Sequence, residues 1–319
     1  MAKNLLDVKD KKILSVLDMN ARASYKQIGK DVGLSRKTVE YRIKNMEEKG
    51  IIKGYFPKVN FLKIGYRIYR IFIRLHNHGP KIEKEIVDFC LSKNNLYWFH
   101  SYGGQYDYGI GILARKNFEF LQFLEELCEK FGQDIMERQI SEAIEIDFYS
   151  HSYLLNNSDM VSCKTSYTFE KLDKTDKEII NILSDDCKIP VVKIAKKLKI
   201  SNTAISKRLE KLIAKNIIMC FRTQIDFIKL GYIYYKVFFT LKKPVSDKKK
   251  LKQFMRDQPN IVYATNPLGR YDIECEMVVE DPNQFHKVLK EIESKFQILK
   301  TNYTIAQSIN KISNSMKLD

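Results

Sequence analysis

Side chains suited to contacting phosphates and base edges gather in two short stretches of the sequence. The first stretch holds Ser35, Arg36, Lys37, Thr38, Tyr41, Arg42 and Lys44. The second holds Ser201, Asn202, Thr203, Ser206, Lys207 and Arg208. Arginine and lysine pair with phosphates, whereas arginine, asparagine and hydroxyl side chains also read base edges. We therefore take these residues as candidate DNA contacts.

A short helix must present the first stretch. Val39, Ile43 and Met46 recur at i, i+4 and i+7, which places them on one helical face. Ser35 is a suitable N-cap, and Gly50 follows the helix as a C′ glycine. Another helical run, 25–32, lies just upstream. Two short helices joined by a tight turn, the second one basic, predict a helix-turn-helix.

Two alternatives to DNA contact stay open. The basic helical faces are also compatible with a winged helix that binds another protein. Arg42 and Arg208 are also compatible with structural ion pairs inside the domain.

The pattern recurs 166 residues later, which indicates an internal duplication. About 20 of the 70 residue pairs are identical when 6–75 is aligned without gaps on 172–241. A repeat of this length is too long for a solenoid unit. We therefore predict a duplicated two-domain module.

The net charge of +16 is concentrated in the helix-turn-helix segments. Residues 1–64 carry +8 and residues 166–230 carry +6, whereas residues 65–165 carry −3. Concentration of positive charge on one type of module favours double-stranded DNA as the partner.

A sheet domain follows each helix-turn-helix in the predicted order. Residues 66–75 alternate as a strand, and a strand–turn–strand pattern surrounds Gly103-Gly104. With the predicted helices 80–91 and 117–131, the order is βαββαβ, which is ferredoxin-like. The fold class is therefore α+β. We expect the sheet face opposite the helices to be rich in apolar side chains and to pack on a second sheet, within one chain or between two chains.

These patterns divide the chain as follows. The predicted segments are a winged helix-turn-helix domain 1–64, a ferredoxin-like domain 65–150, a linker 151–170, a second winged helix-turn-helix domain 171–230, a second ferredoxin-like domain 231–312 and a tail 313–319.

Composition excludes several other classes of protein. No apolar run approaches the ~18 residues of a membrane span, and the N-terminus lacks the apolar core of a signal peptide. The six cysteines are scattered, which predicts free thiols in a cytoplasmic protein. His76-Asn77-His78 lacks further ligands at metal spacing, so we predict no metal site, no cofactor and no catalytic residues.

The ordered set of motifs resembles the Lrp/AsnC (feast/famine) family of transcription regulators. The residues that carry this resemblance are Leu6-Asp7, Asp10, Ile13-Leu14, Leu34-Ser35, Val39, Arg42-Ile43, Gly50-Ile51-Ile52, Gly54 and Gly65, with counterparts from Leu172 to Gly231. The resemblance implies DNA binding, self-association through the sheet domains and an amino-acid-like effector near a G-x-[YF]-D turn. The matching turn residues are Gly104, Gln105, Tyr106 and Asp107, and Gly269, Arg270, Tyr271 and Asp272. The plainer interpretation is a β-turn in which glycine supplies a positive φ and aspartate bonds its own backbone.

One enzyme class has a similar architecture. Siroheme decarboxylases resemble this arrangement and carry an arginine and histidine cluster for the tetrapyrrole. The strand 106–113 has no histidine or arginine. We therefore predict a regulator rather than an enzyme, with a siroheme decarboxylase-like protein as the alternative.

Overall fold

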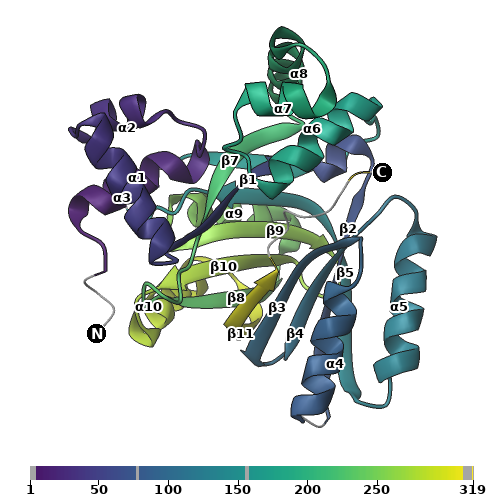
Figure 1. The fold of residues 1–319 in the computed structure, drawn as a ribbon. Helices are drawn as coiled ribbons and strands as arrows, with labels where there is room; N and C mark the ends of the chain where they lie inside the picture. The colour runs from purple at the N-terminus through teal and green to yellow at the C-terminus, as the bar shows by residue number, and fades with distance from the viewer. Residues whose placement is uncertain (1–4, 77–78, 155–157, 312–317, 319) are drawn as a thin grey trace.

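The computed structural model describes residues 5–76, 79–154, 158–311 and 318 (Figure 1). Each half begins with three helices: α1 (Val8–Met19), α2 (Tyr25–Val32) and α3 (Arg36–Glu48), then α6 (Lys174–Asp185), α7 (Val191–Leu198) and α8 (Asn202–Ala214). The Oγ atoms of Ser35 and Ser201 accept hydrogen bonds from backbone N–H groups in the first turn of α3 and α8. Both predicted caps, and the two helix-turn-helix motifs, are confirmed.

Strands β1 (Ile52–Val59) and β7 (Ile218–Ile225) pair with each other as an antiparallel two-stranded sheet. In this ladder Phe56 lies opposite Arg222, and these two positions are 166 residues apart, which is the period of the repeat. The pair therefore maps onto itself when the two copies are exchanged. A pseudo-twofold axis passes through it and relates the two winged domains, which both lie on one side of the sheet domains (Figure 1).

Each sheet domain has the expected ferredoxin-like strand order. The first contains β2 (Arg67–Leu75), β3 (Leu96–Gly104), β4 (Tyr108–Ala114) and β5 (Ile135–Tyr149), paired in the order β5-β2-β4-β3. The second contains β8 (Ile233–Leu241), β9 (Ile261–Leu268), β10 (Ile273–Val279) and β11 (Ile298–Lys311), in the order β11-β8-β10-β9. The predicted βαββαβ order is confirmed in both halves.

The two sheets join edge to edge into a closed ring of eight strands. One seam pairs β3 with β11, and the equivalent seam pairs β5 with β9. Since β5 also pairs with β2, no edge of either four-stranded sheet is left open between the halves. The predicted packing of sheet on sheet thus occurs within one chain, as a barrel.

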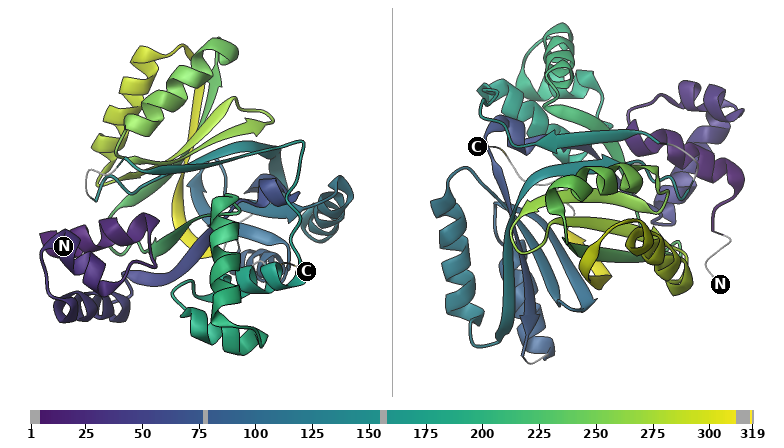
Figure 2. Two further views of the ribbon diagram at one scale, coloured as in Figure 1. Left: turned by 90° about the horizontal axis from the view of Figure 1, so that it is seen from above. Right: turned by 180° about the vertical axis from the view of Figure 1, so that it is seen from behind.

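Helices cover the outside of this barrel. α4 (Pro80–Leu91) and α5 (Asn117–Phe131) lie on one side, and α9 (Pro244–Asp257) and α10 (Pro282–Lys295) on the other (Figure 2). Apolar side chains of β2, such as Ile71 and Ile73, pack under α4 and α5.

The inner face departs from the prediction of an apolar surface. Arg70 and Glu274, which point from opposite halves into the barrel, form a bidentate ion pair with N–O distances of 2.6 and 3.0 Å. Both side chains are buried, at 3% and 0% exposure. Alternation along 66–75 places Arg70 and Ile71 on opposite faces of β2, but it gives no sign of the carboxylate that meets Arg70.

The segment predicted as a linker is not wholly irregular. Residues Met160–Lys164 form β6, which pairs with the C-terminal part of β5. A short 3-10 helix, η1 (Phe61–Ile64), also precedes the first sheet domain. The tail 313–319 lies outside the described residues except for Leu318, which exchanges two backbone hydrogen bonds with the Asn181 side chain. None of the described helices is long and apolar enough to cross a membrane.

The second copy keeps two left-handed turns without glycine. Gly33 and Gly50 have positive φ angles of 67° and 62° in the first copy. Their counterparts Lys199 and Asn216 adopt φ angles of 56° and 53°. Lysine has a Cβ that opposes this conformation, so the turn between α7 and α8 is strained.

We expect Lys199→Gly to raise the free energy of unfolding by about 1 kcal/mol, because glycine adopts the left-handed conformation without a Cβ clash. Urea denaturation measures the change. Lys196→Gly is the matched control, since Lys196 is exposed inside α7, where glycine costs about 1 kcal/mol. The prediction would be contradicted if both variants raised, or both lowered, the free energy of unfolding.

Candidate nucleic-acid interface and interior cavity

The predicted DNA contacts lie on the exposed faces of α3 and α8. Arg36, Lys37 and Tyr41 are exposed, and 71% of the Tyr41 side chain is accessible. In α8, Asn202, Thr203 and Lys207 are exposed as well. The opposite faces are anchored by residues such as Val39 and Ile205, so each helix presents its polar face to solvent.

The remaining predicted contacts differ in exposure and in the bonds they already make. Lys44 is exposed and lies 3.6 Å from Glu48, whereas Thr38 and Ser206 are partly buried. Ser35 and Ser201 have exposed side chains that already cap their helices.

Arg42 and Arg208 have a second role, which the sequence had left open. Arg42 Nη1 lies 2.6 Å from Asp7 and 2.8 Å from Asp10, at the N-terminus of α1. Arg208 repeats this arrangement with Asp173 and Asp176, at 2.7 and 2.6 Å. These ion pairs fix the recognition helix to the first helix of its domain. The backbone N–H of Asp10 together with Arg42 lowers the pKa of Asp7, and Arg208 together with the backbone N–H of Asp176 lowers that of Asp173.

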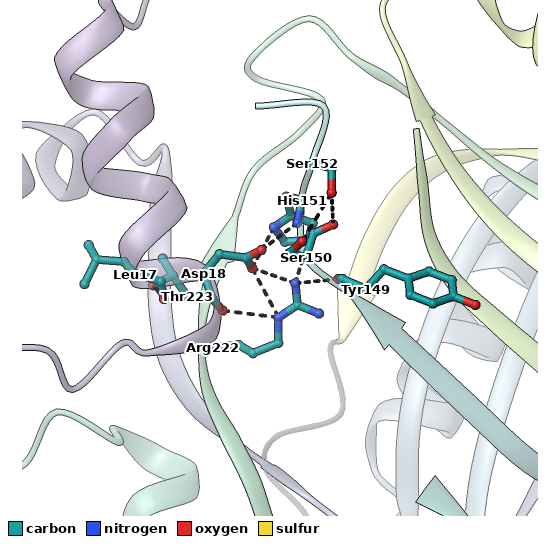
Figure 3. A network of polar contacts seen from close by, with 8 residues as sticks. All are labelled: Leu17, Asp18, Tyr149, Ser150, His151, Ser152, Arg222 and Thr223. Carbon is teal, nitrogen blue, oxygen red and sulfur yellow. Dashed lines mark hydrogen bonds and ion pairs between the residues drawn. The ribbon is translucent and has the colours of Figure 1, made fainter. Parts of the chain in front are cut away.

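A buried polar network joins the two winged domains (Figure 3). Arg222 of β7 donates to Asp18 of α1 through Nε and Nη2, at 3.2 and 2.6 Å. The same carboxylate accepts the backbone N–H of His151 at 2.6 Å, and His151 Nδ1 lies 2.9 Å from it. Asp18 and Arg222 are at most 2% exposed. The facing charges hold the pKa of Asp18 well below its usual range, although burial acts in the opposite direction.

This network breaks the symmetry of the duplication. The counterpart of Asp18 is Ser184, and the counterpart of Arg222 is Phe56, which faces it in the ladder. Only one of the two equivalent junctions therefore has an ion pair. Nothing in the local sequence around Asp18 signals a partner 204 residues away, so the pair was missed by sequence reasoning.

The two G-x-Y-D turns lie at different seams, Gly104 against β11 and Gly269 against β5. The aspartates of both turns have structural partners. Asp107 Oδ2 accepts the backbone N–H of Leu75 at 2.7 Å, and Asp272 Oδ2 accepts that of Leu241 at 2.8 Å. Each aspartate thus bonds a neighbouring strand rather than its own backbone. A positive φ occurs at Gly104 but not at Gly269.

The tyrosines of these turns are brought together as a pair. The hydroxyl groups of Tyr106 and Tyr271 lie 3.1 Å apart, and Gln105 donates to both. Arg270 is half exposed and pairs with Glu137 at 2.7 Å. The two tyrosines thus link the two turns, and both aspartates of the turns accept backbone hydrogen bonds.

A cavity of about 100 Å³ lies inside the barrel, next to β1. Sequence reasoning did not predict it. Its walls are mostly aromatic, and Trp98, Tyr234 and Tyr263 belong to them. Trp98 fits only because its neighbour on β4 is glycine: a Cβ on Gly111 would lie 2.2 Å from the indole nitrogen.

Charged groups also line this cavity. Lys236 lies 3.0 Å from Glu274 and 3.0 Å from Glu276, and Tyr234 donates to Glu276. With the Arg70–Glu274 pair, these groups form a buried network that spans both halves. His100 borders the cavity too, and burial lowers its pKa to about 4, so the imidazole is neutral at pH 7.

Lys58 of β1 is the exception in this network. It is 5% exposed, and among the described residues no carboxylate lies within ion-pair distance of it. Its Nζ instead lies 4.0 Å from the centre of the Phe148 ring and 5.6 Å from that of Tyr263. A desolvated cation–π contact contributes about 2 kcal/mol, whereas burying an ammonium costs several kcal/mol, so the rings offset only part of the cost. Burial lowers the pKa of Lys58 to about 8.

Comparisons with known proteins agree with the arrangement of the helices. The sequence matches the family described as winged helix-turn-helix DNA-binding twice, over residues 6–53 and 172–219. It is 34% identical over 123 residues to the HTH-type transcriptional regulator Ptr1 of Methanocaldococcus jannaschii, a match that covers 38% of this chain and 81% of the relative. It is 43% identical over 67 residues to the HTH-type transcriptional regulator LrpA of Pyrococcus abyssi, covering 21% of this chain and 48% of the relative.

A solved structure covers the whole architecture. The crystal structure of the siroheme decarboxylase NirDL superposes with a TM-score of 0.64 over 98% of this chain and 94% of that chain, at 12% sequence identity. At this level of identity the likeness concerns the fold.

The buried Asp18–Arg222 pair can be tested by mutation. Asp18→Ser installs the residue of the other copy and leaves the Arg222 charge buried without a partner, so we expect a loss of about 3–5 kcal/mol in the free energy of unfolding. Asp18→Ser combined with Arg222→Phe restores the arrangement of the other copy and should recover most of this loss. Urea denaturation is the measurement.

Ser184→Ala, at the position equivalent to Asp18, is the control and should cost less than about 1 kcal/mol. A double variant no more stable than Asp18→Ser would show that the charge imbalance is not the cause.

Proposed function

Because the chain belongs to the Lrp/AsnC family of DNA-binding transcription regulators, we propose that it acts as a covalent pseudo-dimer that reads one DNA site with two different recognition helices. A homodimeric regulator presents two identical helices related by a twofold axis. Here the two helices come from one chain.

The observation that supports this proposal is the β1–β7 ladder. Its pseudo-twofold axis relates α3 to α8 through the Phe56–Arg222 pair. The cores are also shared, because Ile225 and Phe227 from the second half pack with α1 and α3 of the first. The two winged domains are therefore held in one fixed geometry, as the two subunits of a dimer would be.

The surfaces of the recognition helices support sequence-specific binding. Arg36, Lys37 and Lys44 are exposed in α3, and Lys207 is exposed in α8. They suit phosphate and guanine contacts, whereas the exposed Asn202 and Thr203 suit adenine and other base edges. Arg42 and Arg208 contribute mainly by holding these helices in place.

Regulation by a small effector at the interface of the sheet domains is the second part of the proposal. Among the turn residues, Tyr106, Tyr271 and Gln105 hydrogen-bond to one another, and both aspartates accept backbone N–H groups. They therefore suit a structural role better than recognition of an ammonium group. The interior cavity is the better place for an effector at this interface.

A catalytic function has one observation in its favour, the likeness in fold to the siroheme decarboxylase NirDL. The cavity of about 100 Å³ is small beside the ~300–1,000 Å³ of pockets that hold drug-sized ligands. A tetrapyrrole is larger than such ligands, so we favour a regulator without enzymatic activity. Incubation with siroheme tests the choice: a bound-tetrapyrrole absorption spectrum would support the enzyme, and an unchanged spectrum the regulator.

Phosphate contacts should make DNA binding strongly dependent on salt. We expect the logarithm of the association constant to fall linearly with the logarithm of salt concentration, with a slope of several units, because bound lysines and arginines release counterions. Lys37→Ala should reduce the slope by about one unit. Fluorescence anisotropy between 50 and 200 mM salt measures both.

The control is Lys81→Ala, since Lys81 is an exposed lysine on α4, outside the winged domains. A flat salt response of the wild type on duplex DNA would refute the interface.

The preferred DNA site should have two different halves. Because α3 offers Arg36, Lys37 and Tyr41 where α8 offers Asn202, Thr203 and Lys207, the first half-site should be the richer in guanine. In-vitro selection from random DNA measures this. Replacing residues 202–207 with those at 36–41 should make the selected site more symmetric, and each lost base contact should cost about 1–3 kcal/mol.

A perfect palindrome selected by the wild type would mean that two chains pair like with like on DNA. In that case the single chain is not the unit that reads the site.

A further inference from the structure

The interior of the barrel carries one positive charge more than it can balance. Its basic groups are Lys58, Arg70 and Lys236, and its acidic groups are Glu274 and Glu276. Arg70 and Lys236 are both paired with these carboxylates, and His100 is neutral. The excess charge is therefore located on the ammonium of Lys58.

Nearby charges outside the cavity do not correct the imbalance. Asp18 belongs to the neighbouring network, where Arg222 and His151 already surround its carboxylate. Asp147, on β5, pairs with Lys252 at 2.8 Å. Within the part of the chain that the structure describes, the Lys58 ammonium forms no ion pair and lies over the rings of Phe148, Tyr97 and Tyr263.

The cavity beside Lys58 has the size and lining for a small ligand with an apolar part. Its volume is about 100 Å³, compared with the ~150 Å³ of an engineered cavity that holds benzene. Ile146 and Phe148 supply apolar wall, whereas Thr265 and Tyr102 supply hydroxyl groups. A monoanion balances the excess charge, while a dianion such as phosphate would reverse it.

We propose that this cavity binds a short-chain monocarboxylate, whose carboxylate meets the Lys58 ammonium and whose alkyl part lies against the aromatic walls. An amino acid fits less well, since its own ammonium would leave the excess charge in place and would compete with Lys58 for the carboxylate.

The position of Lys58 connects this site to DNA binding, a step that rests on the proposed function. Lys58 belongs to β1, the strand that pairs with β7 and joins the winged domains. The other walls of the cavity come mainly from the barrel. A bound carboxylate therefore connects the winged domains to the sheet domains. It favours the conformation in which the winged domains and the sheet domains are held together.

The test is binding of propionate to the full chain by isothermal titration calorimetry, without DNA. Propionate should bind saturably and raise the melting temperature, and it should bind at least tenfold more tightly than propionamide, its neutral analogue, or alanine. The comparison of acid with amide on the wild type needs no variant. Equal affinity for the two, or no binding of propionate, overturns the proposal.

Lys58→Met then locates the site, because methionine keeps much of the side-chain length but removes the charge. This variant should lose propionate binding at least tenfold while retaining a cooperative melting transition. Lys53→Met is the matched control on the same strand, since Lys53 is half exposed and lies outside the cavity lining. Loss of binding in the control, or retention in Lys58→Met, places the anion elsewhere and refutes this site.

The link to regulation is measured separately, as the change in DNA affinity on adding propionate. We expect at least a threefold change for the wild type and none for Lys58→Met. Failure of DNA binding itself would refute the proposed function and leave the calorimetric result standing. Carboxylate binding without any change in DNA affinity would refute only the coupling.

Discussion

The antiparallel ladder between β1 and β7 is the constraint on which the rest of the structure depends. Each winged domain contributes one strand, so neither strand satisfies its backbone hydrogen bonds inside its own domain. The register centres on Phe56 and Arg222, which fixes the axis that relates the halves. The same pseudo-twofold axis relates the two barrel seams. Rotation about it places the β3–β11 seam on the β5–β9 seam.

Within this symmetric backbone, the side chains at the junctions are not symmetric. On the inner face, Gly109 and Gly111 of β4 correspond to Glu274 and Glu276 of β10. The glycines make room for Trp98 and Tyr102, and the glutamates balance Arg70 and Lys236. The first half therefore fills the interior with large aromatic side chains, and the second half supplies the carboxylates. The glycines and the glutamates occupy equivalent positions, so neither half could replace the other.

Local patterns predicted the elements well. The bounds predicted for α4 and α5 match those observed, and the serine caps place α3 and α8 correctly. Periodicity reports only which face of an element is buried. It cannot report that Arg70 meets a carboxylate 204 residues away, that Arg222 meets Asp18, or that Lys58 lies beside a cavity. These contacts join the halves, and they arise only when the repeat closes on itself. The predicted DNA contacts stay predictions, although the structure places most of them on exposed helical faces.

The joining of both halves in one chain has a consequence for dosage. A homodimeric regulator dissociates into monomers at low concentration. The fraction of molecules that can bind two half-sites therefore falls as the cellular concentration of the protein falls. In this chain the second half is always present at the high effective concentration that a covalent connection imposes. Its halves cannot exchange with those of related regulators, so mixed pairs do not form by that route. Under the proposed function, each recognition helix is then free to diverge without passing its changes to the other, and a few molecules per cell suffice to form complete DNA-reading units.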